Sequence, residues 1–389
     1  MKIHRFEKGD TLELIAKQHG TTGDAICIYN NLGKSSPTIG EELIVLTPTR
    51  TYKTRVNDTL ERISLRFSVK KSKLISINPG ISEGALPVGR ELSLRFSDAC
   101  YGTALANGYF YKGCSNEKLV AALPYLTYIT FSIACFDGGE IKLSDLPKEA
   151  LELAIDSGKI PLIRIYETDK SVKYRSPDDF IDKCILLAER HGFKGITLNL
   201  EDERDDATAC EFLIKMRKRL IGSDLILITE INENSSVDFN DYSDGSVICY
   251  PKLAMNDAPS FDVGERAVFS DFASRGESAK AFIDLPSLAK STDGYIGVER
   301  MLSDAREKRC EIIHDDEKML AHAKFKNNEY TFAPPSNIKA ILDLVYEYGY
   351  MGISFDIMRT PMPYLYMYGA MFSTVAYNGI IEHGSCLDG

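Results

Sequence analysis

Residues 195–201 read GITLNLE, and their pattern is the main basis for predicting how this chain folds. Aliphatic and polar side chains alternate along it, in the order Ile196, Thr197, Leu198, Asn199, Leu200 and Glu201. This two-residue period is typical of a β-strand, because successive side chains point to opposite faces. We expect the aliphatic set to pack against helices and the polar set to point into a barrel. Glu201 would then stand at the carboxyl end of its strand, where barrel enzymes keep their active sites.

Eight strand-like runs, this one included, occur between residue 98 and residue 389. They span 106–111, 128–134, 160–166, 195–201, 225–231, 246–250, 279–285 and 351–357. Apolar residues at helical spacing lie between them, as at 177–191, 207–220 and 337–348. Strands that alternate with helices predict an α/β fold with a parallel sheet. The length suits a (β/α)8 TIM barrel of about 250 residues, and the extra chain at about 291–335 predicts a small insertion subdomain beside the barrel mouth.

An internal repeat occupies the first 97 residues. The tetrapeptide GDTL at 9–12 recurs as NDTL at 57–60, and IGEEL at 39–43 recurs as VGREL at 88–92. Self-similarity at a fixed spacing indicates two copies of one structural unit. Each copy has the pattern of a short strand, two small helices and a second short strand.

The helix starts are legible in both copies. Asp10 and Asp58 are the expected N-caps, with a Glu three residues after each, as in a capping box. The repeat therefore predicts two small α+β (βααβ) modules, at 1–48 and 49–97, in front of the barrel at 98–389.

The plan of the repeat resembles the LysM module, whose pattern runs from G-D-T-L through a mid-module Asn to P-G-Q-x-L. The resemblance covers residues 3–46 and 52–96, and it implies binding to glycans that contain N-acetylglucosamine. It implies a groove between two turns in each copy. The groove residues are Gly9, Asp10, Thr11, Leu12, Thr38, Ile39 and Gly40 in the first copy, and Asn57, Asp58, Thr59, Leu60, Pro87, Val88 and Gly89 in the second.

The chemistry of these turns suits that role. Backbone N–H and C=O groups can hydrogen-bond an acetamido group, while Leu12, Ile39, Leu60 and Val88 offer apolar contact to its methyl. Two weak modules in tandem gain avidity through effective concentration. The alternative is that the turns only pack and bind nothing.

Residues 192–201 resemble the D-G-x-D-x-D-x-E signature on the fourth strand of glycoside hydrolase family 18 barrels. Three further segments resemble parts of this family in matching order, at 123–128, 247–250 and 349–355. With LysM modules in front, the arrangement resembles that of spore cortex-lytic N-acetylglucosaminidases. The chain departs from the signature at its three aspartates, which are Lys194, Thr197 and Asn199 here, and it keeps Glu201.

The resemblance implies that the acetamido oxygen of the substrate is the nucleophile, an exception among glycosidases. Glu201 would protonate the leaving oxygen, Tyr250 would hold the acetamido group, and Asn199 would orient its N–H. A neutral Asn accepts a hydrogen bond but supplies no negative charge to an oxazolinium-like cation, and it cannot tune the acid. Asp356, where the family has Trp, either supplies a compensating carboxylate or pairs structurally with Arg359.

Two functions stay open at this point. One is a peptidoglycan/chitin-directed N-acetylglucosaminidase with substrate-assisted retaining hydrolysis. The other is a catalytically lost family 18-like barrel that serves as a glycan-binding or spore-coat assembly protein. In that second case Glu201 would pair with Arg164, which we expect to point inward from the third strand, and Tyr250 would merely line the barrel.

Charge and composition exclude several classes of binding partner. The formal net charge is −10 at pH 7 without a long basic run, which argues against nucleic acid. No apolar run reaches the ~20 residues of a membrane span, and no spacing suits a metal, so we expect neither metal nor cofactor. The N-terminus MKIHRF has no hydrophobic signal core. We expect no signal peptide, synthesis in the cytoplasm, and action on peptidoglycan or a chitin-type glycan at the spore or cell envelope, with the oligomeric state open.

Overall fold

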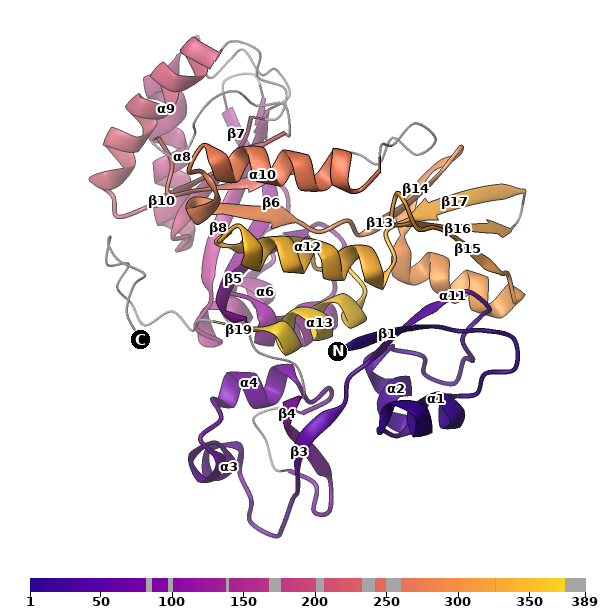
Figure 1. The fold of residues 1–389 in the computed structure, drawn as a ribbon. Helices are drawn as coiled ribbons and strands as arrows, with labels where there is room; N and C mark the ends of the chain where they lie inside the picture. The colour runs from indigo at the N-terminus through magenta and orange to yellow at the C-terminus, as the bar shows by residue number, and fades with distance from the viewer. Residues whose placement is uncertain are drawn as a thin grey trace.

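The computed structural model describes residues 1–81, 86–96, 101–137, 140–167, 176–200, 206–232, 242–249, 260–325 and 327–374. A closed barrel forms its centre, two small modules lie against one side, and an antiparallel sheet projects beside the barrel (Figure 1). The expected α/β class with a TIM barrel and two preceding modules is confirmed.

The barrel consists of eight parallel strands. They are β5 (Gly102–Tyr111), β6 (Tyr128–Asp137), β8 (Ile160–Glu167), β9 (Gly195–Asn199), β10 (Ile226–Ile231), β11 (Gly245–Ile248), β12 (Ala281–Asp284) and β18 (Gly352–Asp356). Their order is β5-β18-β12-β11-β10-β9-β8-β6, and the pairing of β5 with β6 closes the ring. Two short strands extend it, β7 (Glu140–Leu143) beside β6 and β19 (Phe372–Thr374) beside β5. Each of the eight expected strands is present.

Helices cover the outside of the barrel. They are α5 (Asn116–Ala122), α6 (Lys148–Asp156), α8 (Pro177–His191), α9 (Asp206–Ile221), α10 (Ala267–Ser274), α12 (Pro335–Glu347) and α13 (Met362–Met371). The one-turn helices η1 (Leu123–Tyr125) and η4 (Ser278–Lys280) and the short π-helix η3 (Asp262–Arg266) accompany them. The sequence of α8 sets both of its ends. Pro177 opens the helix, and Gly192 closes it in the left-handed region at φ 77°.

The alternation in β9 works as expected. Ile196, Leu198 and Leu200 belong to the same core as the helix residues Phe180 and Leu213. Thr197 and Asn199 are on the opposite face of the strand. Gly195 is required at the start, because a Cβ there would lie 2.4 Å from Ile226 Cγ1 and 2.6 Å from the Ile226 carbonyl oxygen.

A separate five-stranded antiparallel sheet follows β12, and with its helix we call it the insertion subdomain. Its elements are β13 (Leu288–Ser291), β14 (Gly294–Gly297), α11 (Val298–Lys308), β15 (Ile312–Asp315), β16 (Leu320–Phe325) and β17 (Asn328–Phe332). The strand order is β14-β13-β17-β16-β15, so β15 is an edge strand. That edge faces the first N-terminal module (Figure 1).

Both N-terminal modules have the expected βααβ order. The first contains β1 (Lys2–Arg5), α1 (Leu12–His19), α2 (Gly23–Tyr29) and β2 (Glu42–Val45). The second contains β3 (Pro48–Lys53), α3 (Leu60–Phe67), α4 (Lys71–Ser76) and β4 (Glu91–Phe96). Each module has a small apolar core of its own.

The expectation that Asp10 and Asp58 cap helices is wrong by one residue. Thr11 and Thr59 are the N-caps, and each hydroxyl accepts a backbone N–H at 3.2 Å. The two carboxylates instead close the preceding turn, where Asp10 accepts from Glu7 N at 2.9 Å and Asp58 accepts from Arg55 N at 2.6 Å. Asp accepts turn N–H groups as readily as helix N–H groups, so the pattern alone does not distinguish the two.

Candidate functional site

Two of the four predicted catalytic residues are in the described part of the chain. Asn199 ends β9 and Asp356 ends β18. Parallel strands end together at the same rim of a barrel, so both lie at its carboxyl-end mouth. Glu201 and Tyr250 lie outside the described residues, and their roles stay predictions.

A buried carboxylate, Glu230 of β10, lies beside Asn199, its pairing partner on the neighbouring strand β9. It is 2% exposed, and the amide nitrogen of Asn199 donates to its Oε2 at 2.9 Å. Arg164 of β8 donates to both carboxylate oxygens, at 2.7 Å from Nε and 2.7 Å from Nη2. The hydroxyl of Tyr109 of β5 donates to Oε1 at 2.8 Å. Four strands thus contribute to one network below the barrel mouth, which we call the Glu230 network.

Sequence reasoning placed Arg164 inside the barrel correctly and missed its partner. The sequence did contain a clue to this partner. Glu230 is two residues after the inward-facing Ile228, so it points to the same face of the strand, and it is the one acid in β10. Paired inward charges are expected to be retained only when their hydrogen bonds are satisfied. The sequence does not tell which strands bring the two charges together.

The Glu230 network carries a defined charge. Burial alone would raise the pKa of Glu230, but the Arg164 guanidinium and the hydrogen bonds of Asn199 and Tyr109 hold it below its usual value. Burial and the neighbouring Glu230 carboxylate raise the pKa of Tyr109 well above its usual value, so its phenol stays a donor. The pair is therefore an ionised Glu230 with Arg164, and Glu230 is no candidate for a general acid.

Glu230 also fixes the orientation of the Asn199 amide. A carboxylate only accepts hydrogen bonds, so the end of the amide that contacts it must be the NH2 group. The oxygen of Asn199 is then the end that can accept from a substrate N–H.

Asp356 is engaged at the mouth. Its carboxylate accepts from the Tyr111 hydroxyl at 3.0 Å and pairs with Arg359 Nη1 at 3.2 Å. It also accepts from the backbone N–H of Met358 at 2.9 Å. Burial raises the pKa of Asp356 in spite of these contacts. Of the two alternatives for Asp356, the structural pairing with Arg359 is present.

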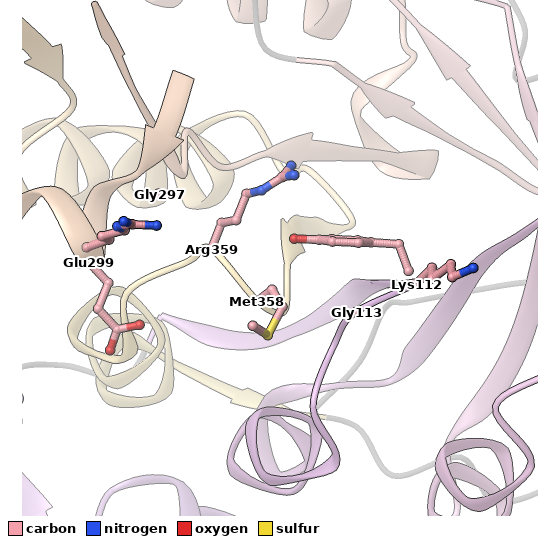
Figure 2. A pocket seen from close by; sticks show the side chains of 8 residues that line it. Lys112, Gly113, Gly297, Glu299, Met358 and Arg359 are labelled. Carbon is pink, nitrogen blue, oxygen red and sulfur yellow. The ribbon is translucent and has the colours of Figure 1, made fainter. Parts of the chain in front are cut away.

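A cavity of about 290 Å³ opens between the barrel rim and the insertion subdomain (Figure 2), and two of its lining residues, Tyr111 and Arg359, contact Asp356. Its lining residues are Tyr111, Lys112, Gly113, Gly297, Glu299, Arg300, Met358 and Arg359. Met358 and Arg359 come from the loop after β18, and Glu299 and Arg300 come from the start of α11. Arg359 lies 4.9 Å from the centre of the Tyr111 ring, as in a cation–π contact. Arg359 is paired with Asp356 and Glu299 with Lys118, so Lys112 and Arg300 give this cavity an excess of positive charge that attracts anionic groups.

The predicted glycan turns differ between the two modules. In the second, Pro87, Val88 and Gly89 are exposed. In the first, Thr38 and Gly40 are buried against the insertion subdomain.

Comparison with known proteins identifies the modules. The LysM domain family matches residues 4–45 and 52–95. Both N-terminal modules are LysM domains. The Bacillus subtilis protein YdhD, which is named as a sporulation-specific glycosylase, is 32% identical over 253 residues, or 61% of this chain. That match spans 59% of the length of YdhD.

Solved structures share the fold of nearly the whole chain or of about two thirds of it. The spore cortex-lytic enzyme SleL of Bacillus cereus matches with a TM-score of 0.73 over 96% of this chain and 98% of its own, at 19% identity. A chitinase of Chromobacterium violaceum matches 69% of this chain and 99% of its own, with a TM-score of 0.61 and 14% identity. The barrel thus has the fold of the family 18 glycoside hydrolases.

One predicted sugar contact in the second LysM domain is wrong. Leu60 is 1% exposed and belongs to the core of that domain, so its side chain has no surface to offer a sugar. As the first helical residue after the Thr59 cap, it turns inward against Ile63 and Leu74.

No helix in the described part of the chain is long and apolar enough to cross a membrane. Nor do the described residues include a group of three His, Cys, Asp or Glu side chains that could hold a metal ion.

Proposed function

We propose that this chain is an N-acetylglucosaminidase that acts on peptidoglycan and uses the substrate's acetamido group as its nucleophile. The observation that carries the proposal is the geometry of Asn199. Its side chain turns into the barrel at the carboxyl end of β9, two positions before Glu201, with its amide nitrogen bonded to Glu230. The fold likeness to family 18 enzymes supports the same reading.

The proposed reaction has two steps. The acetamido oxygen attacks the anomeric carbon while the bond to the leaving oxygen breaks, and that oxygen takes the proton of Glu201. The Asn199 oxygen accepts the acetamido N–H and holds the group in line. Water then opens the oxazolinium-like intermediate, and Glu201 takes a proton from this water. Tyr250 would hold the acetamido oxygen.

The charge of the mouth favours peptidoglycan over chitin as the substrate. Lys112, Arg300 and Arg359 line the cavity with Glu299 as the one acid among its lining residues. Peptidoglycan carries carboxylates on its lactyl or peptide groups, whereas chitin is neutral. An anionic polymer approaching an acidic protein is repelled unless a local patch of opposite charge receives it. The setting that fits this substrate is the spore or cell envelope.

Glycan cleavage by the purified full chain tests the proposal. Spore cortex fragments and chitin oligomers are incubated with the parent and with Glu201→Gln, and mass spectrometry identifies the new reducing ends. We expect cleavage of cortex fragments by the parent and a loss of about 10²–10⁴-fold with Glu201→Gln. Equal rates for the two proteins would overturn the assignment of Glu201.

A second candidate function is a catalytically lost barrel that binds glycan without cutting it. Two observations favour it, because Arg164 neutralises the charge of Glu230 and Arg359 neutralises that of Asp356. Neither carboxylate is then free to replace the charge that an Asp at position 199 would supply. Retention of the parent on cortex without any cleaved product would select this function.

A further inference from the structure

The second turn of the first LysM domain is already occupied by the chain itself. The backbone N–H of Ile312 donates to the Ile39 carbonyl at 2.9 Å, and Thr38 Oγ1 donates to the Cys310 carbonyl at 2.5 Å. His314 Nε2 donates to the Gly40 carbonyl at 2.7 Å. The edge strand β15 of the insertion subdomain thus lies along this turn and takes the carbonyl groups of Ile39 and Gly40, while the Ile39 side chain stays 42% exposed.

Charged contacts reinforce this docking. Arg306 of α11 donates to both carboxylate oxygens of Glu41, at 2.6 Å from Nη2 and 3.1 Å from Nε. The Glu41 side chain is 3% exposed, so the pair is largely shielded from water. Arg5 pairs with Asp316 at 2.7 Å on the rim of the same interface. Removing one partner of a shielded, bidentate ion pair costs much stability, because the other charge is left buried without a counter-ion. This contact is therefore specific.

The approach of the two segments is as close as backbones allow. A Cβ built on Gly40 would lie 1.9 Å from the carbonyl oxygen of Ile312. Only glycine fits at that point, and no sugar ring can enter between the two backbones.

The equivalent turn of the second LysM domain is open. Val88 is 64% exposed, and a Cβ on Gly89 would find nothing nearer than Lys53 Cε at 3.7 Å. Within the residues that the structure describes, no hydrogen bond engages the carbonyl oxygen of Val88 or of Gly89. This domain docks through another surface. Lys73 of α4 donates to the Gly369 carbonyl at 2.5 Å and to the Phe372 carbonyl at 2.9 Å, at the end of α13.

We propose that only the second LysM domain binds glycan in this chain, and that the first has become the seat of the insertion subdomain. The proposal rests on LysM glycan binding as part of the proposed function. The ligand is a β-linked N-acetylglucosamine oligomer, held by the backbone groups of the turns at 57–60 and 87–90 with Val88 against its methyl groups.

The docked first LysM domain also contacts a residue at the barrel mouth. Asn31 of the first LysM domain donates to Glu299 Oε1 at 2.8 Å, and Lys118 after β5 pairs with the same carboxylate. Glu299 lines the cavity between the barrel rim and the insertion subdomain. The first LysM domain therefore helps to fix one wall of the candidate substrate site.

Matched substitutions at equivalent positions test the division of labour in the full chain. Val88→Glu and Ile39→Glu place the same charge on the second turn of each LysM domain. Binding of a β-1,4-N-acetylglucosamine hexamer is measured by isothermal titration calorimetry, with Leu65→Glu as the control for a new charge on an exposed helix of the second LysM domain. We expect Val88→Glu to remove one binding site per chain, or weaken it roughly tenfold or more. We expect Ile39→Glu and Leu65→Glu to bind as the parent does.

Hydrogen exchange on the parent gives a readout that needs no variant to fold. The hexamer should slow exchange at 57–60 and 87–90 and leave 38–41 unchanged. Loss of a site through Ile39→Glu, or new protection at 38–41, would overturn this proposal while leaving LysM glycan binding intact. A parent chain that binds no hexamer and no peptidoglycan would overturn glycan binding by the LysM domains, and this proposal with it.

Discussion

Glu230 determines what the residue at position 199 can do. A carboxylate 2% exposed is stable only because Arg164, Asn199 and Tyr109 satisfy it. Each partner comes from a different strand, so the network also connects four strands of the barrel. Any substitution at position 199 therefore changes the hydrogen bonding of Glu230 as well as the contacts with a substrate.

Removing the charge of Glu230 should destabilise the fold. Glu230→Gln leaves Arg164 without its counter-ion, and we expect a loss of about 3–5 kcal/mol in the free energy of unfolding, measured by urea denaturation. Folding lowers the pKa of Glu230 below its ordinary value of 4.5. The ionised carboxylate therefore stabilises the fold above pH 4.5, and this stabilisation is lost as the pH falls through the pKa of the folded state. The gap between parent and variant should therefore narrow below about pH 4. A loss as small as that of the exposed control Glu152→Gln would contradict the network.

Asn199→Asp is expected to fail as a simple repair of the family signature. The introduced carboxyl would meet Glu230 at the 2.9 Å now spanned by a hydrogen bond. Two such groups share a proton and titrate as a pair, so one stays neutral near pH 7. We expect no gain in hydrolysis and a loss of about 1–3 kcal/mol in stability. Since the folded state binds the extra proton more tightly, this loss should grow as the pH rises above about 4.

The double variant Asn199→Asp/Glu230→Gln separates charge from position. It keeps one carboxylate beside Arg164 and moves it to β9, so stability should recover relative to either single change. If the barrel is an enzyme, hydrolysis of cortex fragments should rise above that of the parent, because the charge then faces the developing cation. Strict additivity of the two losses in stability would rule out the proposed coupling.

Elements were the level at which the sequence was most informative. Period-two alternation such as that of β9 is local, so all eight strands could be predicted, and Thr197 and Asn199 could be assigned to the inner face. The N-cap of the first helix was predicted one residue too early, because Asp10 and Thr11 are both good capping residues and the pattern does not distinguish them. The Glu230–Arg164 pair depends on strand order, and the docking of Glu41 on Arg306 joins residues 265 positions apart. Neither leaves a local pattern.

Gly195 offers a test of how β9 positions Asn199. Gly195→Ala should push β9 away from β10, because its Cβ would lie within 2.6 Å of the Ile226 carbonyl oxygen. We expect a loss of about 1–3 kcal/mol in stability and a change in the pH dependence that Glu230 confers. Gly222→Ala is the matched control, since its Cβ would meet nothing nearer than 3.5 Å. Equal behaviour of the two variants would show that β9 tolerates the added methyl.

The whole molecule treats two similar LysM domains differently. Their sequences give no hint of this, since the repeat predicts the same groove in both. The difference comes from an edge strand more than 260 residues further along the chain. The first domain is fixed to the insertion subdomain through β15 and α11, and the second is fixed to the barrel helix α13 through α4 (Figure 1).

Undocking the first LysM domain should create a binding site. Arg306→Ala leaves the Glu41 carboxylate buried without its counter-ion, which favours separation of the domain from the insertion subdomain. We expect faster hydrogen exchange at 38–41 and at 312–315, and one additional hexamer site per chain by calorimetry. Lys308→Ala, on the exposed side of α11, is the control. Faster exchange without a new site would mean that the first groove has lost its affinity for glycan altogether.

The distance along the chain between Glu41 and Arg306 has a consequence for synthesis. The first LysM domain emerges from the ribosome 265 residues before the arginine that will hold it. At roughly 5–20 residues per second, its turn waits on the order of 10–50 s for that partner. A nascent chain passes through a period in which the turns at 38–41 and 87–90 are both uncovered, and completion of the insertion subdomain covers the first of them. Translation itself thus sets the moment at which the two copies stop being equivalent.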